Sequence, residues 1–280
     1  MKRTLLIAVV VAGLAACGAL SSAATLTPAA ASTDSAESAI SPPQANETAF
    51  PPGVNESGVT GPLALATAHR ETLGNTSYAA VTTITFQRPN GTVVAEATTI
   101  TRVESGGESF SVATTGSQSN ASAPLGVDHY RSERWVNETT VVVADTLRSE
   151  EPTYRQVNRE NSLTGPDANW ELLYGAFGTG ETIYVGQVER GGTTLHKIVS
   201  TPSRTEATDG PVDGTTYDFS ALVDSEGVVH NFQTTQRSTL EGETVVVTRT
   251  MRITEIGNTT VERPDWYEQA VENDTETASE

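Results

Sequence analysis

From residue 78 onward, the chain consists largely of segments in which Thr and Val recur at a period of two. This period is typical of β-strands, in which successive side chains point to opposite faces of a sheet. The first two segments, Tyr78–Gln87 and Thr92–Val103, flank Asn90-Gly91. An Asn-Gly dipeptide between alternating segments favours a two-residue hairpin turn. The sequence therefore predicts strands that pair antiparallel with their neighbours.

Further segments of this kind follow, and turn-like dipeptides such as Asn137-Glu138 and Gly191-Gly192 separate several of them. They are Phe110–Thr115, Asp128–Val136, Thr139–Arg148, Thr153–Val157, Thr182–Glu189, Thr193–Ser200, Thr215–Val223, Val228–Leu240 and Glu243–Ile256. Loops this short join antiparallel neighbours, whereas each parallel pair needs a longer crossover. We therefore expect a mainly β (α+β) fold: an antiparallel meander of about eleven strands, curled into an open half-barrel and covered on one face by short helices.

A first helix is expected before the strands. It begins near Thr60, a suitable N-cap, and has Pro62 in its first turn, where the missing N–H costs no hydrogen bond. It ends near Leu73, and Leu63 and Ala66 share an apolar stripe with Leu73.

A second helix is expected over Asp167–Phe177, with Asp167 as its N-cap. Its apolar residues recur at helical spacing and form a stripe of Trp170, Leu173, Tyr174 and Phe177. In the first strand, one face is formed by Tyr78, Ala80, Thr82, Ile84 and Phe86. Because a sheet with one apolar face needs a cover, we expect this helix to lie over that face.

Two interpretations of this cover remain open. The helix either closes a filled core, or it encloses with the sheet a cavity that admits an acyl or isoprenoid chain. The candidate pocket residues are Tyr78, Ile84, Phe86, Trp135, Trp170, Leu173, Tyr174 and Phe177. Arg249 is in phase with Val247 and Met251, so its cation is a candidate for the rim of that interior. Alternatively, Arg249 extends along a strand end to reach water.

The N-terminus has the form of a lipoprotein leader. Lys2 and Arg3 precede an apolar run that is too short to cross a bilayer, and Leu14-Ala15-Ala16-Cys17 has the form of a lipobox. Cys17 is the only cysteine of the chain, so no disulfide can form within it, and the lipobox explains why a single thiol is present. We expect the chain to be exported, lipidated on Cys17 and anchored to the outer face of the cell membrane.

Four regions are expected along the chain. Residues 1–16 are the signal peptide, and residues 17–49, rich in Ala, Ser, Thr and Pro without apolar periodicity, form a disordered tether. Residues 50–270 form a single β-rich domain. Residues 271–280 form a disordered acidic tail.

The charge of the chain restricts its partners. It has 35 acidic and 17 basic residues, and beyond the leader its only lysine is Lys197. Such a surface looks like that of proteins from extreme halophiles, in which carboxylates keep the protein soluble. No basic stripe is present to neutralise phosphates, so nucleic acid is not expected as a partner.

Asparagine usage also favours an exported protein. Most of the asparagines stand in Asn-x-Ser/Thr sequons, the acceptor sequence for N-glycosylation. The candidate sites are Asn46, Asn55, Asn75, Asn90, Asn120, Asn137, Asn258 and Asn273.

Several short motifs together resemble a group of uncharacterised haloarchaeal lipoproteins. They are the lipobox, Phe50-Pro51-Pro52-Gly53-Val54, Gly58-Val59-Thr60, the helix with Ala68-His69 and Leu73, Ser77-Tyr78, and Val261-Glu262-Arg263-Pro264-Asp265-Trp266. More remotely, a helix followed by a long antiparallel meander is similar to Lol-type carriers and to the mycobacterial LppX/LprG lipoproteins. That resemblance implies a half-barrel with an apolar cavity for acyl chains.

No motif of a known catalytic site is found, and we expect neither an enzyme nor a cofactor nor a metal site. The histidines lack ligand spacing, and His69 is expected to be structural or solvated. The leading hypothesis is a cell-surface lipoprotein whose half-barrel binds lipid or lipoprotein acyl chains without catalysis. The alternative is a structural or protein-interaction lipoprotein with a filled core, whose protein partner the sequence does not identify.

Overall fold

The structure is a computed structural model that describes residues 49–118, 129–147, 150–158, 166, 168–201, 203–204, 216–240 and 242–277. For residues 203–204, 216–217 and 273–277, only the backbone is described. Residues from Phe50 onward form one compact unit. The expected signal peptide, Cys17 and most of the expected tether lie outside the described residues.

The described elements agree closely with the expected ones. The helices are α1 (Pro62–Gly74), α2 (Trp170–Gly178) and α3 (Tyr267–Thr277). The strands are β1 (Val54–Asn55), β2 (Gly58–Val59), β3 (Tyr78–Gln87), β4 (Val93–Val103), β5 (Phe110–Gln118), β6 (His129–Val136), β7 (Val141–Leu147), β8 (Thr153–Val157), β9 (Thr182–Arg190), β10 (Thr193–Ser200), β11 (Ser203–Arg204), β12 (Thr216–Val223), β13 (Val229–Leu240) and β14 (Glu243–Thr254). The sequence does not predict the β1–β2 hairpin or β11.

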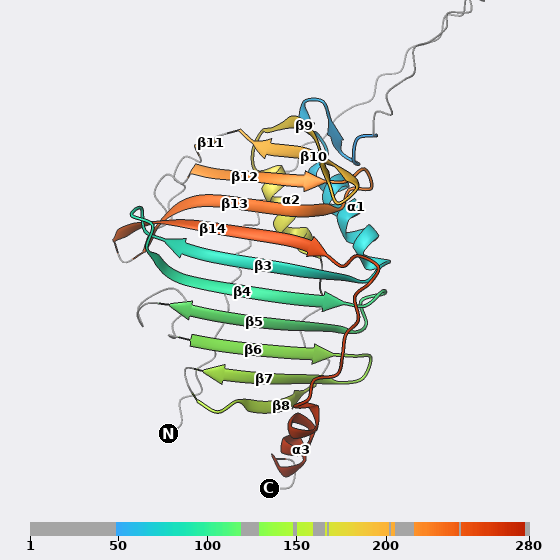
Figure 1. The fold of residues 1–280 in the computed structure, drawn as a ribbon, viewed down its shortest axis with the longest axis vertical. Coiled ribbons are helices and arrows are strands. Elements are labelled where there is room, and N and C mark those ends of the chain that lie inside the picture. The colour runs from blue at the N-terminus through green and yellow to red at the C-terminus, as the bar shows by residue number, and fades with distance from the viewer. Residues whose placement is uncertain are drawn as a thin grey trace, which may run out of the picture. The chain divides into compact units, whose positions relative to one another are not determined.

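The larger sheet is open and antiparallel, which confirms the predicted fold class. Its strand order is β8-β7-β6-β5-β4-β3-β14-β13-β12-β10-β9, and β11 pairs with β12 (Figure 1). The sheet therefore consists of two meanders that are joined where β3 pairs with β14, from Ala79 opposite Thr254 to Gln87 opposite Val246. Between β8 and β9 the chain passes from one edge of the sheet to the other, and α2 lies in this connection.

Helix α1 differs from the prediction at its N-terminus. Its N-cap is Gly61, not Thr60, and the hydroxyl of Thr60 donates to the carbonyl of Gly53 instead of accepting a hydrogen bond from the first turn of the helix. Its buried residues are Leu65, Ala66, His69 and Leu73. The placement of Leu63 on the buried stripe was wrong, since Leu63 is 56% exposed. None of the described helices is long and apolar enough to span a membrane.

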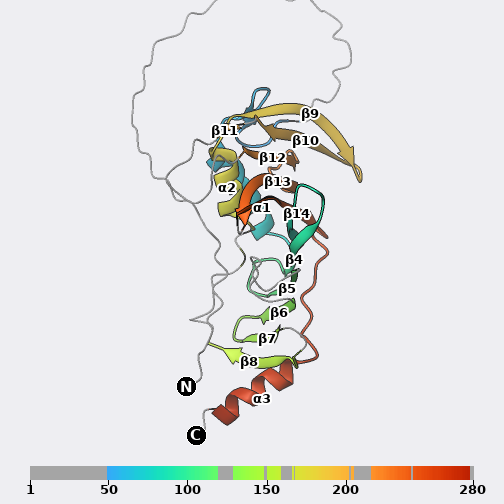
Figure 2. The ribbon, with the colours of Figure 1, turned by 90° about the vertical axis from the view of Figure 1, so that its left-hand side faces the viewer.

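Helices α1 and α2 pack on one face of the sheet. They lie behind the upper strands in Figure 1, and α2 lies to the left of these strands in Figure 2. Leu65 and Leu73 of α1 and Leu173 and Phe177 of α2 belong to one buried cluster. The sheet contributes residues from β3 to β7, from β10 and from β12 to β14, among them Tyr78, Phe110, Val141, Ile198, Phe219, Phe232 and Met251.

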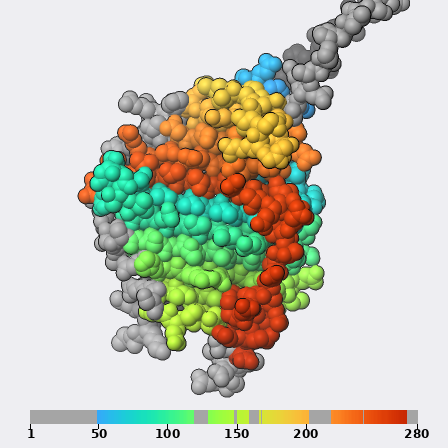
Figure 3. Space-filling view, in the orientation of Figure 1, coloured from blue at the N-terminus to red at the C-terminus, as the bar shows by residue number. Residues whose placement is uncertain are grey.

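The C-terminal helix α3 packs on the opposite face, at the β7–β8 end of the sheet. Trp135 and Val142, register partners on β6 and β7, form a second cluster with Ala270 of α3. Figure 3 shows this face, with the C-terminal segment in red running along the strand ends to α3. The helix continues to Thr277, beyond the expected domain end at residue 270.

Candidate functional site

Three of the candidate pocket residues lie in a filled core. Tyr78, Leu173 and Phe177 are buried beneath the helices. The ring of Phe177 lies 5.5 Å from that of Phe219 and 6.0 Å from that of Phe232, in edge-on contacts. Protein side chains thus occupy the space between α2 and strands β12 and β13, as in a close-packed interior.

Two others, Trp170 and Tyr174, differ in burial: Trp170 is partly buried and packs against the core cluster, whereas Tyr174 is exposed. Their rings are stacked with centroids 5.3 Å apart, and Tyr174 is 43% exposed. The guanidinium of Arg70 on α1 lies 5.0 Å from the centre of the Trp170 ring, a cation–π contact between the two helices. Three residues of the predicted stripe of α2 therefore contact the core, and the fourth, Tyr174, lies at the surface.

Ile84 and Phe86 lie farther along β3, on the same face as Tyr78, and both are partly buried. On β14 their register partners are Arg249, opposite Ile84, and Val247, opposite Phe86. We call these four residues the β3–β14 strip. It lies on the face that α1 and α2 cover, since Met251, the next residue of this face on β14, belongs to the core cluster with them.

Arg249 is the only charged residue of the β3–β14 strip. It is partly buried, and its other register partner, Thr234 of β13, is buried. Among the described residues, no carboxylate forms an ion pair with Arg249. The strip thus combines apolar surface with a cation that no described side chain neutralises.

Trp135 is not brought together with the other candidate pocket residues. Its side chain belongs to the cluster on the opposite face, where its ring meets that of Tyr267 edge-on at 5.5 Å. The neighbouring Trp266 donates a hydrogen bond from Nε1 to Glu133 at 2.9 Å. Trp135 therefore holds α3 against the sheet.

His69 of α1 is completely buried and connects three elements. Its Nδ1 accepts a hydrogen bond from the backbone N–H of Val229 at 3.0 Å, so Nε2 carries the proton and donates to the carbonyl of Ala168 at 2.9 Å. Burial lowers the pKa of His69 to about 4, although the Ala168 hydrogen bond raises it. His69 is thus a neutral link from α1 to β13 and to the segment before α2. The four-residue spacing of Leu65, His69 and Leu73 is the sequence signal that places it in the core.

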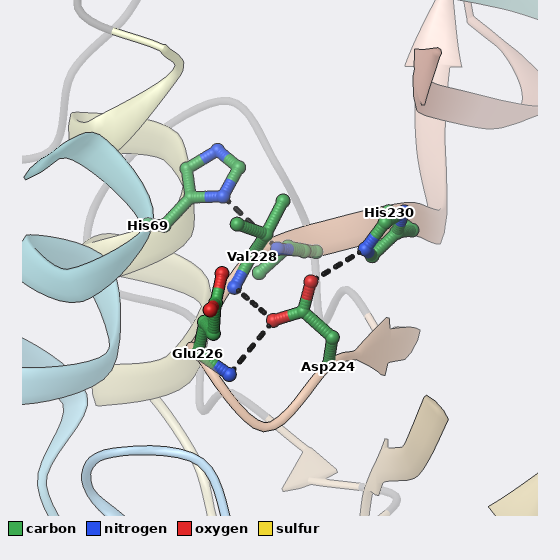
Figure 4. Close-up of polar contacts among 6 residues, drawn as sticks. His69, Asp224, Glu226, Val228 and His230 are labelled. Carbon is green, nitrogen blue, oxygen red and sulfur yellow. Dashed lines mark hydrogen bonds and ion pairs between the residues drawn. The ribbon is translucent and has the colours of Figure 1, made fainter. Parts of the chain in front are cut away.

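Asp224 organises the turn between β12 and β13, next to His69 (Figure 4). Its carboxylate accepts hydrogen bonds from the backbone N–H groups of Glu226 and Val228 and lies 2.7 Å from Nε2 of His230. Burial raises the pKa of Asp224, but the hydrogen bonds from His230 and the two N–H groups outweigh it and lower the pKa overall. This arrangement stabilises a turn. Across the described part of the chain, no group of three His, Cys, Asp or Glu side chains is placed to hold a metal ion.

A hollow of about 300 Å³ lies over β4–β7. Most of its lining comes from the sheet face away from α1 and α2, including Glu96, Thr98, Ser117, His129 and Arg131. Arg131 pairs with Glu133. Polar and apolar groups contribute about equally to this lining, and Glu96 and Arg131 place charges in it, so the hollow suits an acyl chain less well than an apolar cavity would.

Three sequons adopt the same turn. The side-chain oxygens of Asn55, Asn90 and Asn137 accept hydrogen bonds from the N–H two residues later, at 2.8, 3.0 and 3.1 Å. In Asn75, the side-chain amide instead donates to the carbonyl of Glu71. Asn258 is exposed in the turn after β14. Asn46 and Asn120 lie outside the described residues, and only the backbone of Asn273 is described, within α3.

Comparison with family models gives no match, and neither does comparison with curated proteins. The predicted membership of a haloarchaeal lipoprotein family therefore stays a prediction.

Solved structures show a remote resemblance. LprF from Mycobacterium bovis has 12% identity and a TM-score of 0.42, covering 74% of this chain and 99% of its own. The lipoprotein LppX from Mycobacterium tuberculosis has 10% identity and a TM-score of 0.34, covering 72% and 98%. A LolA superfamily protein from Nitrosomonas europaea has 9% identity and a TM-score of 0.22, covering 71% and 95%. Because these TM-scores lie below 0.5, no property of those proteins is transferred to this chain.

Proposed function

We propose that the chain is a membrane-anchored surface protein whose sheet domain binds an acyl or isoprenoid chain along the β3–β14 strip, without catalysis. The observation that carries the proposal is the environment of the Arg249 side chain. It is partly buried beside Ile84, Val247 and Met251 and forms no ion pair with any described carboxylate. This is unexpected in a chain with 35 acidic residues and 17 basic ones.

A lipid with an anionic headgroup would supply a negative charge to pair with Arg249 of the β3–β14 strip. A cation that is partly removed from water is unfavourable unless an opposite charge pairs with it. A carboxylate or phosphate would form charge-assisted hydrogen bonds with the guanidinium of Arg249. The attached hydrocarbon would then cover the partly exposed side chains of Ile84 and Phe86.

The two contributions differ in size. Burial of hydrocarbon contributes about 0.8 kcal/mol per methylene. A hydrogen bond to a charged group contributes about 1.5–3 kcal/mol. Contact with the acyl chain would therefore provide most of the affinity, and Arg249 would select the headgroup.

The anchoring part of the proposal is carried by Cys17, the lipobox cysteine. Replacing Cys17 with Ser removes the thiol that receives the lipid. We expect the Cys17→Ser protein to appear in the soluble fraction, without the added mass of a lipid on its N-terminal peptide. Retention of the variant in the membrane fraction would contradict lipid anchoring.

A second function is favoured by one observation, the filled core beneath α1 and α2. The aromatic rings of Phe177, Phe219 and Phe232 occupy the space in which a carrier with an internal cavity would hold its ligand. A protein of this kind would act through its surface, as a structural or protein-interaction lipoprotein without a small ligand.

Native mass spectrometry of the full chain, released from its membrane in mild detergent, distinguishes the two functions. In addition to the covalent lipid on Cys17, we expect one non-covalently bound lipid per chain, identified after extraction with organic solvent. The variant Ile84→Asn should lose this lipid because it places a polar group on the strip. The matched control is Thr85→Asn on the opposite face of the same strand, which should retain the lipid. A wild-type chain without lipid, or equal loss from both variants, would favour the surface function.

A further inference from the structure

Most of the exposed large apolar side chains lie on elements at one end of the sheet domain. Five of the seven among the described residues lie on the N-terminal segment, α1, α2 and β9. We call them the tether-end surface: Phe50, Leu63, Tyr174, Ile183 and Val185. The other two, Val93 and Leu147, lie at the start of β4 and the end of β7. Ile183 and Val185 point away from α1 and α2, because Tyr184 between them pairs with Ile198 of the buried cluster. Two neighbouring exposed apolar side chains on an edge strand indicate a contact surface.

The chain enters the domain at this surface. The ring of Phe50 lies 5.0 Å from that of Tyr184 on β9 and 5.4 Å from that of His196 on β10. Strand β9 forms the edge of the sheet, and Figures 1 and 3 show it at the upper end with the N-terminal segment, in blue, beside it. In the sequence, 32 residues (18–49) separate the lipobox cysteine from this point.

The β9 edge is poorly suited to pairing with another strand. At its start, the backbone N–H of Val59 donates to the hydroxyl of Thr182 at 2.6 Å, so β2 covers this part of the edge. Farther along, the register between β9 and β10 shifts at Val185, and Gly186 has a φ of +132°. Such a bulge interrupts the row of backbone groups that a partner strand would need. A planar apolar surface fits these residues better than a second copy of the chain does.

Cations accompany the apolar side chains. Lys197 of β10, the only lysine beyond the leader, is the register partner of Gly186, and Arg190 ends β9. Neither forms an ion pair with a described carboxylate. Apolar side chains with flanking cations are typical of protein segments that lie in a membrane interface.

From this arrangement we propose that the tether-end surface lies against the lipid bilayer, with Ile183 and Val185 entering the headgroup region. The inference rests on the anchoring part of the proposed function and not on lipid binding at the β3–β14 strip. The anchor holds the domain near the bilayer, and the tether-end surface determines which end faces it.

Site-directed fluorescence labelling tests this orientation, and the label can be placed at a single position because Cys17 is the only native cysteine. In the anchored protein, the only native thiol carries the lipid, so a cysteine introduced by substitution is the only reactive one. Val185→Cys and Ile183→Cys are labelled with the environment-sensitive dye NBD in the full, membrane-bound chain. The matched controls are Leu147→Cys and Val93→Cys, since these positions are 38% and 45% exposed, against 55% and 48% at 185 and 183.

We expect blue-shifted NBD emission at positions 183 and 185, with loss of fluorescence when lipids carrying a spin-label quencher are added. Positions 93 and 147 should keep water-like emission and remain unquenched. Equal quenching at all four positions, or no quenching at 183 and 185, would overturn the proposal. Dimers formed by a bis-maleimide linker at position 185 in membranes would also overturn it, in favour of a second copy of the chain. Fractionation and the mass of the N-terminal peptide report anchoring separately, so failure of the anchor is distinguishable from failure of the orientation.

Discussion

Arg249 of β14 and Ile84 of β3 are register partners in the centre of the sheet, on the face that α1 and α2 cover. The two strands belong to opposite ends of the chain, and their pairing joins the two meanders into one sheet. Through this pairing, the cation of Arg249 lies next to partly buried apolar side chains. Among the described residues, no carboxylate forms an ion pair with it. The proposed lipid site depends on this juxtaposition.

Arg249 should control headgroup preference. In the Arg249→Gln variant, we expect affinity for a fatty acid to fall by about 10- to 100-fold, the equivalent of one lost charge-assisted hydrogen bond. Affinity for the matching fatty alcohol should change little, because hydrocarbon contacts are retained. Competition of both ligands against a fluorescent acyl probe measures this. An equal loss for both would mean that Arg249 acts only by shaping the strip.

His69 should make stability depend on pH between its two pKa values. In the folded chain burial lowers its pKa to about 4, whereas the unfolded chain has the ordinary value of 6.5. Between these values the unfolded state binds more protons, so the free energy of unfolding falls as the pH is lowered from about 6.5 to 4, by about 3 kcal/mol in total. Urea unfolding at a series of pH values measures the slope.

The matched control for this prediction is His69→Gln. Its amide can donate to Ala168 and accept from Val229 but does not titrate. The slope between pH 6.5 and 4 should be shallower in this variant. Asp224, whose pKa is lowered from 3.8, contributes a separate loss of stability below about pH 4. An unchanged slope in His69→Gln would contradict the assignment.

Phe177 should be the residue of α2 on which the fold depends most. It is buried between Phe219 and Phe232, so Phe177→Ala leaves a cavity and is expected to destabilise the domain by about 3–5 kcal/mol. Tyr174→Ala on the exposed side of the same helix should cost less than about 1 kcal/mol. Equal losses in urea unfolding would show that the helix does not pack as described.

Sequon occupancy should follow side-chain hydrogen bonding. Asn55 and Asn90 are exposed, and their side-chain oxygens accept the N–H two residues later, which leaves the amide nitrogen outside this hydrogen bond. In Asn75 the amide nitrogen donates to Glu71. We expect glycans on Asn55 and Asn90 and lower occupancy on Asn75, measured by mass spectrometry of glycopeptides. Higher occupancy on Asn75 would contradict this order.

The sequence predicts the strands well because their signal is local. Alternation along each segment and turns such as Asn90-Gly91 specify where strands begin and end, and all eleven expected strands are found within a few residues. The β3–β14 pairing has no local signal, because it joins segments more than 150 residues apart. Nothing in either strand identifies its non-sequential neighbour.

The candidate pocket residues were predicted less well than the strands, because not all of them were assigned to the correct face of their element. Trp135 was included with Trp170 among the pocket residues, yet the register of β6 turns it to the face under α3. Leu63 was assigned to the buried stripe of α1, but the stripe runs through Leu65, His69 and Leu73. Arg249 and Ile84 were correctly placed on the face directed to the interior, since phase along a single strand suffices for that.

The central claim is that lipid binds along the β3–β14 strip, and photo-cross-linking in the native membrane tests it most directly. The anchored chain is irradiated with a fatty acid that carries a diazirine in its hydrocarbon chain, and the adducts are located by peptide sequencing in a mass spectrometer. We predict adducts on Ile84, Phe86 and Val247, with lower yield in Ile84→Asn and unchanged yield in Thr85→Asn. Adducts confined to Ile183 and Val185, with none on β3 or β14, would show contact with the bilayer alone and would contradict the binding site.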